Sequence, residues 1–559
     1  MKPTLYLIFY FATIGFISAQ DFPMNPLPKG QWLETGEKWN EVEQISLNPF
    51  TEDVQVQAGK GVFYAVATAD SPARLESKTA FGNLKLHFEF LQDVSTEAAL
   101  ILGGGMQINL NNSWDKPQAL LGHVSGGAIP DQNVCKAPGL WQKVELVFSQ
   151  KSANLPGRLE RLLINGIVIY ENAMLPSLGN KPAPIVFQVS KGLLALRNVE
   201  YSNFGDKRPV HISNIHYTLK ETEGWGKTFE PKSTPLEEGD LEKLTKSFPN
   251  EFENFIVTFT GDMEVDKTDK YAFTIDYQGV SDLKIDGKKV TGSDEYIYRI
   301  PSMGLIDLSK GKHRFEFKYQ RIWWPPGFGI FVSAGDFRPY GLHDPKSLPQ
   351  PQQVGGISVE PEAEKAKLIR SFMEFGEVKR TAVMTVGSIE KRHFSFDLDA
   401  GNLLFAWKGK FADVTEMWFE RGEPQIIKPL GSAIQLAGDT PVRLQGESEA
   451  DSLAMQLDEY YLDKKGLPTF NYLYKGKLFS EKITPISKGL EIEVSAENND
   501  FVFELAKAAH LEKLSETLYK TDDYYVEVPK GVKVNLEKKG GLTVLSAEPN
   551  ALSSYKIIW

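Results

Sequence analysis

Short runs of alternating apolar and polar residues recur along most of this 559-residue chain, between turns rich in Gly, Pro, Asn and Asp. A period of two puts one face of a β-strand on a core and the other toward solvent. The clearest run is 84–90, where every second residue is apolar and the last polar one is Glu89. Few segments keep a helical period over ten residues. The sequence therefore predicts an all-β fold.

Charge and composition narrow the range of partners. The formal net charge is −11, with acidic and basic residues interspersed, which argues against nucleic acid and anionic membrane surfaces. The chain has 10 Trp, 20 Tyr and 34 Phe. Aromatic rings fill β-sandwich cores, and they also stack on the faces of sugars, so a neutral ligand is favoured.

The first nineteen residues have the features of a signal peptide. Lys2 precedes an apolar run over 5–17, which ends in Ser18 and Ala19. The run is too short for a comfortable membrane span, and no second long apolar run follows. We therefore expect a periplasmic or extracellular protein without an integral membrane segment. The single cysteine, Cys135, excludes an intramolecular disulfide, and no cysteine suited to a lipid anchor follows the cleavage region.

Turn signals and composition predict three domains after the signal peptide. They cover 30–220, 221–345 and 357–559, and a segment rich in Pro, Gln and Gly at 346–356 is the predicted linker. Residues 360–375 are rich in charge and in good helix formers, and they predict one short helix.

The first predicted domain resembles the 3-keto-disaccharide hydrolase family. The resemblance implies a concanavalin-like jelly-roll sandwich. Within it, Asn165-Gly166 is a hairpin turn. Five short segments carry the resemblance, in order: 81–90, 106–108, 139–146, 163–170 and 196–201.

This resemblance implies cleavage of a glycosidic bond in a 3-keto sugar. The C3 ketone acidifies the C2 proton, so the C1 substituent can leave by elimination before water adds. The base would be Glu89 or His123, and Gln107 and Arg197 would hold the enolate or the ring hydroxyls. The paired-carboxylate Glu-x-Asp-x-x-Glu pattern of retaining glucanases is absent, and Asn109 stands near where an acidic residue is expected.

The second predicted domain resembles the carbohydrate-binding domain first known from anthrax protective antigen, which forms a β-sandwich or barrel. Four segments carry this resemblance, namely 259–265, 269–275, 283–290 and 308–317. The adjacent Asp-Asp pair with which such domains hold calcium is missing. The aromatic residues predicted to contact carbohydrate are Trp323 and Trp324 here, with Trp114 and Trp141 in the first domain.

The third predicted domain is mostly β and resembles a domain attached to bacterial c-type cytochromes and sugar dehydrogenases. The resemblance lies in 393–399, 403–409, 411–418, 429–432 and 466–470. No Cys-x-x-Cys-His motif is present, so we expect no covalent haem, no other cofactor and no metal. Any sugar dehydrogenase or cytochrome would be a separate partner.

Two functions remain open from the sequence. The first is an exported glycoside hydrolase of polysaccharide-degrading bacteria, acting on 3-keto di- or oligosaccharides with an appended glycan-binding domain. The alternative is a non-catalytic glycan-binding or scaffold protein that works beside a separate dehydrogenase.

Overall fold

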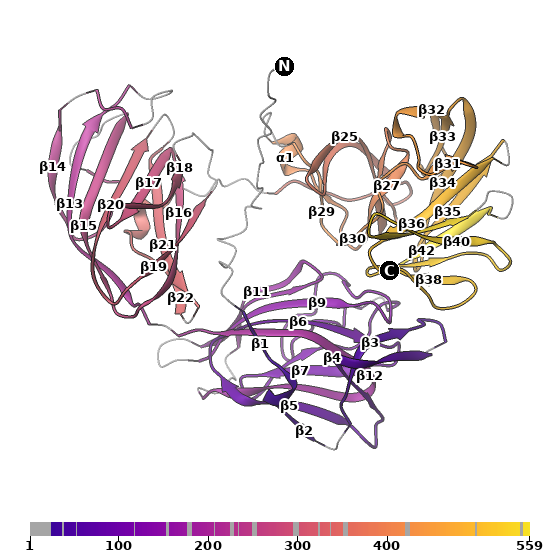
Figure 1. Ribbon diagram of the computed structural model, residues 1–559, viewed down its shortest axis with the longest axis horizontal. Coiled ribbons are helices and arrows are strands. Elements are labelled where there is room, and N and C mark those ends of the chain that lie inside the picture. Colours follow the sequence, from indigo (N-terminus) through magenta and orange to yellow (C-terminus); the bar gives the residue numbers. More distant parts are fainter. Residues whose placement is uncertain are drawn as a thin grey trace. The chain divides into compact units, whose positions relative to one another are not determined.

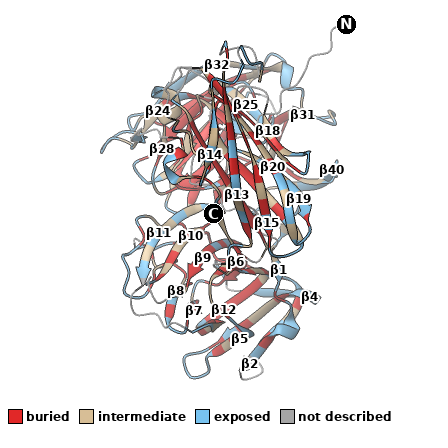
Figure 2. Cartoon of the chain, turned by 90° about the vertical axis from the view of Figure 1, so that its left-hand side faces the viewer, coloured by how far each residue is buried: buried red, intermediate tan, exposed pale blue. Residues whose placement is uncertain are grey.

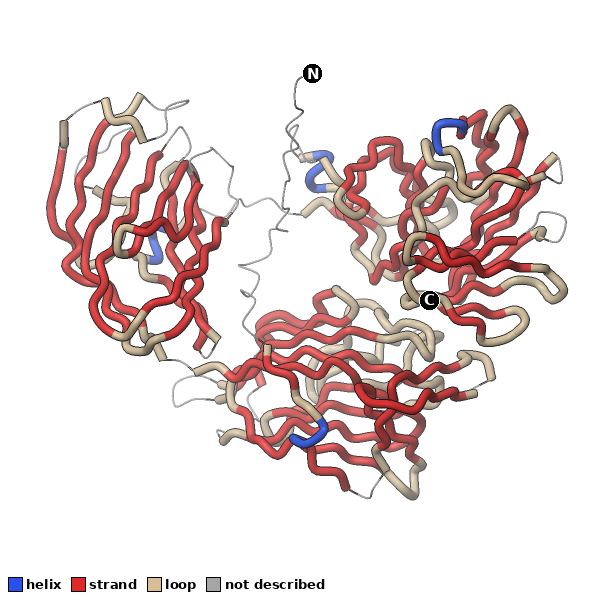
Figure 3. The backbone as a smooth tube through the Cα atoms, in the orientation of Figure 1, coloured by secondary structure: helices blue, strands red, loops and turns tan. Residues whose placement is uncertain are grey.

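Strands make up most of the described part of the chain in a computed structural model (Figure 3), with 62% of those residues in strands and 3% in helices. This confirms the all-β, multidomain prediction. The predicted signal peptide and most of the predicted linker lie outside the described residues. The structure describes residues 24–35, 38–51, 53–116, 118–151, 156–175, 181–205, 207–223, 229–232, 234–248, 254–293, 301–321, 325–335, 337–349, 356–419, 425–497, 500–547 and 552–559.

The chain divides into two compact units. Among the described residues, one comprises 24–25 and 202–349, and the other combines 26–201 with 356–559. The first unit is therefore inserted, in sequence, between the two parts of the second. Residues 26–201 are called the jelly roll below, and residues 355–559 the C-terminal part.

The jelly roll consists of two antiparallel sheets that share one long strand, β12 (Ala183–Asn203). The first sheet has the order β11 (Ile167–Leu175), β10 (Gly157–Ile164), β9 (Gln142–Ser149), β6 (Leu84–Gln92), β12, β4 (Val54–Ala67) and β3 (Asn40–Leu47). The second sheet contains β2 (Trp32–Thr35), β5 (Ala73–Phe81), β12, β7 (Glu97–Leu102) and β8 (Met106–Asn109). The short β1 (Asn25–Pro26) also pairs with β12, and η1 (Lys29–Gln31) precedes β2.

Gly192 marks the place where β12 passes from one sheet to the other. Its φ of +78° lies in the left-handed region, and a Cβ there would lie 2.8 Å from backbone atoms of Thr96. The next amide, of Leu193, donates to the Asp93 carboxylate at 2.9 Å. Only glycine fits this bend without strain.

Alternating burial shows why these segments form strands. Along β5, buried and less buried residues alternate over its first five positions (Figure 2). Leu84, Leu86 and Phe88 are buried as their spacing predicts, and Phe88 packs edge-on against Phe187 with ring centroids 5.1 Å apart. The predicted hairpin turn is present, with positive φ at Asn165 and Gly166.

The inserted unit is a second antiparallel sandwich with its own core, to which, among the described residues, only those of this unit contribute. One sheet has the order β14 (Glu237–Leu241), β13 (Val210–Glu221), β15 (Phe255–Val265), β20 (Gly311–Arg321), β17 (Val280–Ile285) and β18 (Lys288–Ser293), several of which lie side by side in Figure 1. The other contains β19 (Ser302–Leu308), β16 (Asp269–Gln278), β21 (Gly327–Ala334) and β22 (Phe337–Gly341), and η2 (Pro345–Ser347) follows.

The C-terminal part is also antiparallel. Its first half holds β23 (Ser358–Val359), β28 (Ala412–Asp413) and β29 (Lys428–Pro429), then a sheet of β24 (Lys367–Phe375), β25 (Val378–Gly387), β26 (Arg392–Asp397), β27 (Asn402–Lys408) and β30 (Ser432–Gln435), with α1 (Thr415–Trp418). Its second half holds a sheet of β31 (Val442–Leu444), β36 (Phe501–Ala508), β41 (Leu542–Ala547) and β40 (Val534–Lys539), with η3 (Ser452–Ala454). A longer sheet runs β32 (Met455–Leu462), β33 (Pro468–Tyr474), β34 (Lys477–Ile486), β35 (Gly489–Ala496), β42 (Ser554–Ile558), β39 (Tyr525–Glu527), β38 (Leu518–Lys520) and β37 (Glu512–Lys513).

Two sequence-based expectations differ from the structure. The helix predicted over 360–375 is wrong, because β24 occupies its second half and buries Ile369, Ser371 and Met373 at every second position. Strand β13, which the boundary at 220/221 assigns to the first domain, pairs with β15 of the inserted unit. Among the described helices, none is long and apolar enough to cross a membrane.

Candidate functional site

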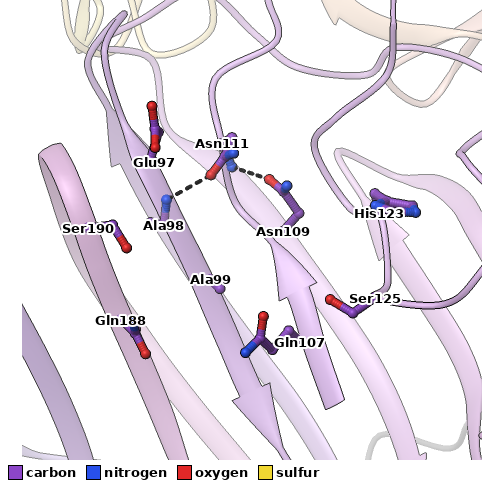
Figure 4. A pocket seen from close by; sticks show the side chains of 10 residues that line it. All are labelled: Glu97, Ala98, Ala99, Gln107, Asn109, Asn111, His123, Ser125, Gln188 and Ser190. Carbon is purple, nitrogen blue, oxygen red and sulfur yellow. Dashed lines mark hydrogen bonds between the residues drawn. The ribbon is translucent and has the colours of Figure 1, made fainter. Parts of the chain in front are cut away.

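A polar hollow of about 230 Å³ lies on the outer face of the second jelly-roll sheet. Polar side chains supply most of its lining, and Figure 4 shows them around a central space. The lining residues are Glu97, Ala98, Ala99, Gln107, Asn109, Asn111, His123, Ser125, Gln188 and Ser190.

The strand register explains the floor of this pocket. Gln188 on β12 lies opposite Ala99 on β7, and Ala99 lies opposite Asn109 on β8. The three side chains thus form one row across the sheet. Because Ala99 carries only a methyl group, the row is lowest at its centre, and the longer amides rise on either side.

The far wall of the pocket comes from the connection after β8. The backbone amide of Asn109 donates to the backbone carbonyl of His123 at 2.8 Å. The backbone amide of Ser125 donates to the backbone carbonyl of Gln107 at 3.0 Å. These bonds attach the segment containing His123 and Ser125 to the edge of the sheet. The His123 ring is held through a 3.3 Å contact of Nε2 with the Gly127 carbonyl.

Two asparagines in the pocket have their oxygens engaged by backbone amides. Asn109 Oδ1 accepts from the Asn111 amide at 2.7 Å, and Asn111 Oδ1 accepts from the Ala98 amide at 2.8 Å. Their Nδ2 groups are then the ends that can donate to a ligand oxygen. Glu97 and His123 stand on opposite sides of these amides (Figure 4). The site combines one carboxylate, one imidazole and several neutral donors and acceptors.

The pocket brings together two of the four predicted catalytic residues, Gln107 and His123. The other two form an ion pair outside the pocket lining, with Arg197 Nη2 2.7 Å from Glu89 Oε2. Asn198 Nδ2 also donates to Glu89 at 3.2 Å. Burial raises the pKa of the Glu89 carboxyl, but the hydrogen bonds and charge of Arg197 outweigh it and hold that pKa below its usual value. This pocket is thus lined by Gln107 and His123 and not by Glu89 or Arg197.

The two predicted tryptophans of the jelly roll are buried, so neither presents an exposed ring face to a sugar. Trp141 is 8% exposed, and the Arg197 guanidinium lies over its ring at 4.1 Å. Trp114 is 4% exposed, and its indole nitrogen donates to the Trp559 carbonyl at 2.7 Å. Trp323 and Trp324 lie outside the described residues.

Sequence reasoning did not select Glu97, Asn111, Ser125, Gln188 or Ser190. The available signal was the interruption of apolar strands by polar residues, as Gln188 and Ser190 alternate with the buried Phe187 and Val189 on β12. No metal site emerges either, because no group of three or more His, Cys, Asp or Glu suited to a metal ion occurs among the described residues.

The fold and the pocket define a β-sandwich domain with a polar site on one sheet. Residues 29–204 match the family model of the 3-keto-alpha-glucoside-1,2-lyase-like domain. This match confirms the first resemblance and relates the domain to carbohydrate-active proteins. The resemblances for 221–340 and 357–559 stay predictions.

Solved structures with low sequence identity also resemble parts of the chain. A Parabacteroides distasonis protein named as a candidate glycosyl hydrolase is 16% identical, with a TM-score of 0.24, covering 32% of this chain and 99% of its own. A β-glucosidase from Kluyveromyces marxianus in complex with glucose is 12% identical, with a TM-score of 0.18, covering 22% of this chain and 16% of its own. No curated protein sequence matches this chain.

Proposed function

We propose that the jelly-roll pocket binds a neutral sugar ring and cleaves the glycosidic bond of a 3-keto glycoside. The observation that carries the proposal is the convergence of His123, Gln107 and the two asparagines in one pocket of the domain that matches the lyase-like family. The volume of about 230 Å³ is below the roughly 300–1,000 Å³ of drug-sized ligand pockets. That size suits a single sugar ring.

His123 is the base in this proposal. It removes the C2 proton, whose acidity comes from the neighbouring C3 ketone, and the charge moves onto the ketone oxygen. The amide groups of Gln107 and Asn109 donate to that oxygen and stabilise the enolate. The electron pair then forms the C1–C2 double bond while the C1–O bond breaks, and the leaving oxygen takes a proton from water. Addition of water to the double bond completes a net hydrolysis.

Glu97 orients the sugar in this scheme. Its exposed carboxylate accepts hydrogen bonds from ring hydroxyls, and Ser190 and Gln188 offer further partners on the same side of the pocket. The ion-paired Glu89 is assigned no chemical step, because its carboxylate is already engaged by Arg197 and Asn198.

A non-catalytic glycan-binding protein is the second candidate function. The observation in its favour is that the ionisable residues of the pocket lining are limited to Glu97 and His123, with neutral amides and hydroxyls elsewhere. Neutral amides bind sugar hydroxyls without any chemistry.

The proposal also includes the location of the protein, the role of the inserted unit and the source of the 3-keto sugar. We place the protein in the periplasm or outside the cell, with the inserted unit as a glycan-binding module. A separate sugar dehydrogenase or c-type cytochrome would supply the 3-keto sugar.

Incubation of the purified protein with native and 3-keto disaccharides, followed by measurement of monosaccharide release, tests the proposal. We expect release from a 3-keto substrate, at least a hundredfold slower in His123→Ala. The matched control is His87→Ala, because His87 lies on β6, pairs with Glu200 at 3.5 Å and is not part of the pocket lining. Absence of release from every substrate, with sugar binding measurable by calorimetry, would favour the binding protein.

A further inference from the structure

One long connection forms a wall of the pocket and also meets the C-terminal part of the same unit. It joins β8 to β9 and spans residues 110–141, of which 117 is outside the described residues. Asn111, His123 and Ser125 of this connection line the pocket. Other side chains of the same connection contact residues between 408 and 559.

The first contacts fall at Trp114 and Gln132. Besides the hydrogen bond from Trp114 to the Trp559 carbonyl, the Lys488 ammonium lies 5.0 Å from the Trp114 ring centroid. Gln132 uses both ends of its amide. Its Nε2 donates to the Leu430 carbonyl at 3.0 Å, and its Oε1 accepts from the Lys410 amide at 3.1 Å.

Further contacts follow along the last residues of the connection. Lys136 Nζ lies 2.6 Å from a carboxylate oxygen of Asp523. The Tyr525 hydroxyl donates to the Pro138 carbonyl at 2.6 Å. The buried Lys408 side chain donates to the carbonyl of Cys135. Lys136 and Lys408 are only 6% and 3% exposed, so these are buried polar contacts whose loss is costly.

Hydrogen bonds within the connection link the residues that contact the C-terminal part to the residues that line the pocket. Asn133, next to Gln132, donates to the carbonyls of Ser113 and Lys116 and so joins the two limbs of the connection. Asn112, next to the pocket residue Asn111, accepts from the Trp114 amide at 3.0 Å and donates to the Asp93 carbonyl at 3.1 Å.

We propose that the C-terminal part positions the pocket wall, so that the shape of the sugar site depends on contacts made by residues 408–559. Trp114 and Gln132 are then positioning residues, acting through Asn112 and Asn133 on Asn111 and His123. The order of the wall follows from these contacts alone, whereas the effect on ligand affinity rests on the proposed function.

Hydrogen exchange on the full chain tests the wall directly. The amides of Asn109, Gly122 and Ser125 donate to backbone carbonyls at 2.8, 2.8 and 3.0 Å, and these bonds hold the wall to β8. Gln132→Met keeps the side-chain length and removes both hydrogen bonds to the C-terminal part. We expect exchange at the three amides to speed up roughly threefold to tenfold. Gln132→Glu keeps the acceptor for Lys410 and should restore part of the protection.

The matched control is Ser46→Ala. Ser46 on β3 donates to Glu512 of the C-terminal part at 2.7 Å, but it lies outside the connection. Its loss should leave exchange at the three amides unchanged. Exchange in Gln132→Met equal to that of the native protein, or an equal rise in Ser46→Ala, would overturn the proposal.

Titration calorimetry with a 3-keto disaccharide and its native parent tests the consequence for binding. We expect Gln132→Met to weaken binding about tenfold while Ser46→Ala binds like the native protein. Equal binding by Gln132→Met would overturn the dependence of affinity on the C-terminal part. If the native protein binds neither sugar, the proposed function fails, and hydrogen exchange still decides whether the wall is positioned.

Discussion

Arg197 stabilises the ionised form of the Glu89 carboxyl group. The Glu89 side chain is 10% exposed and the Arg197 side chain 35% exposed. Arg197→Met would leave a largely buried carboxylate with Asn198 as its remaining partner among the contacts described above. We expect a loss of about 2 kcal/mol in the free energy of unfolding, less than for a fully buried pair because solvent screens the guanidinium.

A double-mutant cycle with urea denaturation checks this coupling. Adding Glu89→Gln to Arg197→Met should recover part of the loss, because it removes the stranded charge. Strictly additive losses would show that the pair contributes no coupling energy.

Glu481 is a buried acid in the C-terminal part. It is 3% exposed, and its Oε2 has no hydrogen-bond partner among the described residues. Burial raises the pKa of this carboxyl from 4.5 to about 8. Between pH 4.5 and 8, this carboxyl is therefore protonated in the folded state but ionised in the unfolded chain. This group's contribution to stability is fully present below pH 4.5 and falls as the pH rises toward 8.

Replacing Glu481 by Gln should remove this pH dependence. As the pH rises from 5 to 7, the free energy of unfolding of Glu481→Gln should increase relative to that of the native protein by about 1 kcal/mol per pH unit. Urea denaturation at both pH values measures the difference. Glu493→Gln, at an exposed position on the neighbouring strand β35, is the control and should show no such gain. Parallel pH profiles for Glu481→Gln and the native protein would contradict the assignment.

At the scale of elements, the small side chain of Ala99 on β7 leaves room for a ligand between Gln188 and Asn109. Ala99→Leu on β7 places a branched side chain between Gln188 and Asn109. We expect sugar binding to fall at least tenfold while the melting temperature changes little, because position 99 faces outward. Calorimetry and thermal unfolding measure the two effects.

Ala80→Leu is the matched control for the pocket floor. Ala80 is exposed on β5 of the same sheet and is not part of the pocket lining. It should bind sugar like the native protein. Binding by Ala99→Leu at native affinity would place the ligand elsewhere.

Local pattern predicted the elements better than it predicted the site. The alternation in 84–90 and the Asn165-Gly166 turn gave a strand and a hairpin, because both depend on neighbouring residues. Over 360–375, the period of two at Ile369, Ser371 and Met373 outweighed a helix-favouring composition. The position of Glu89 is fixed by its ion pair with Arg197, which lies 108 positions further along the chain. The residue pattern of a single strand contains no information about such a long-range contact.

The pocket shows the same limit. Gln107 was selected because it lies in the resembling segment 106–108, and His123 because it lies in a Gly-rich loop at 121–127. Glu97 and Gln188 join them only because β7 pairs with both β8 and β12. That strand order is a long-range property of the sandwich.

At the scale of the whole molecule, the inserted unit should fold without the rest. In the part of the chain that the structure describes, its buried cluster draws only on residues between Val210 and Phe337. We expect residues 202–349 alone to unfold cooperatively, whereas residues 26–201 alone should be less stable than in the full chain, because they lose the partners of Trp114, Gln132 and Lys136. Thermal unfolding by circular dichroism compares the pieces with the full protein. A jelly roll as stable alone as in the full chain would contradict this expectation.

The position of the insertion also determines the order in which the parts of the larger unit are synthesised. Residues 202–354 separate the two parts of one unit, so a ribosome must make them all before the first partner of the jelly roll appears. At about 5–20 residues per second, the delay is roughly 8–30 seconds. During that interval the surfaces of Trp114 and Lys136 are uncovered on the nascent chain. The jelly roll therefore exists for a time without the contacts that the C-terminal part supplies to these two side chains.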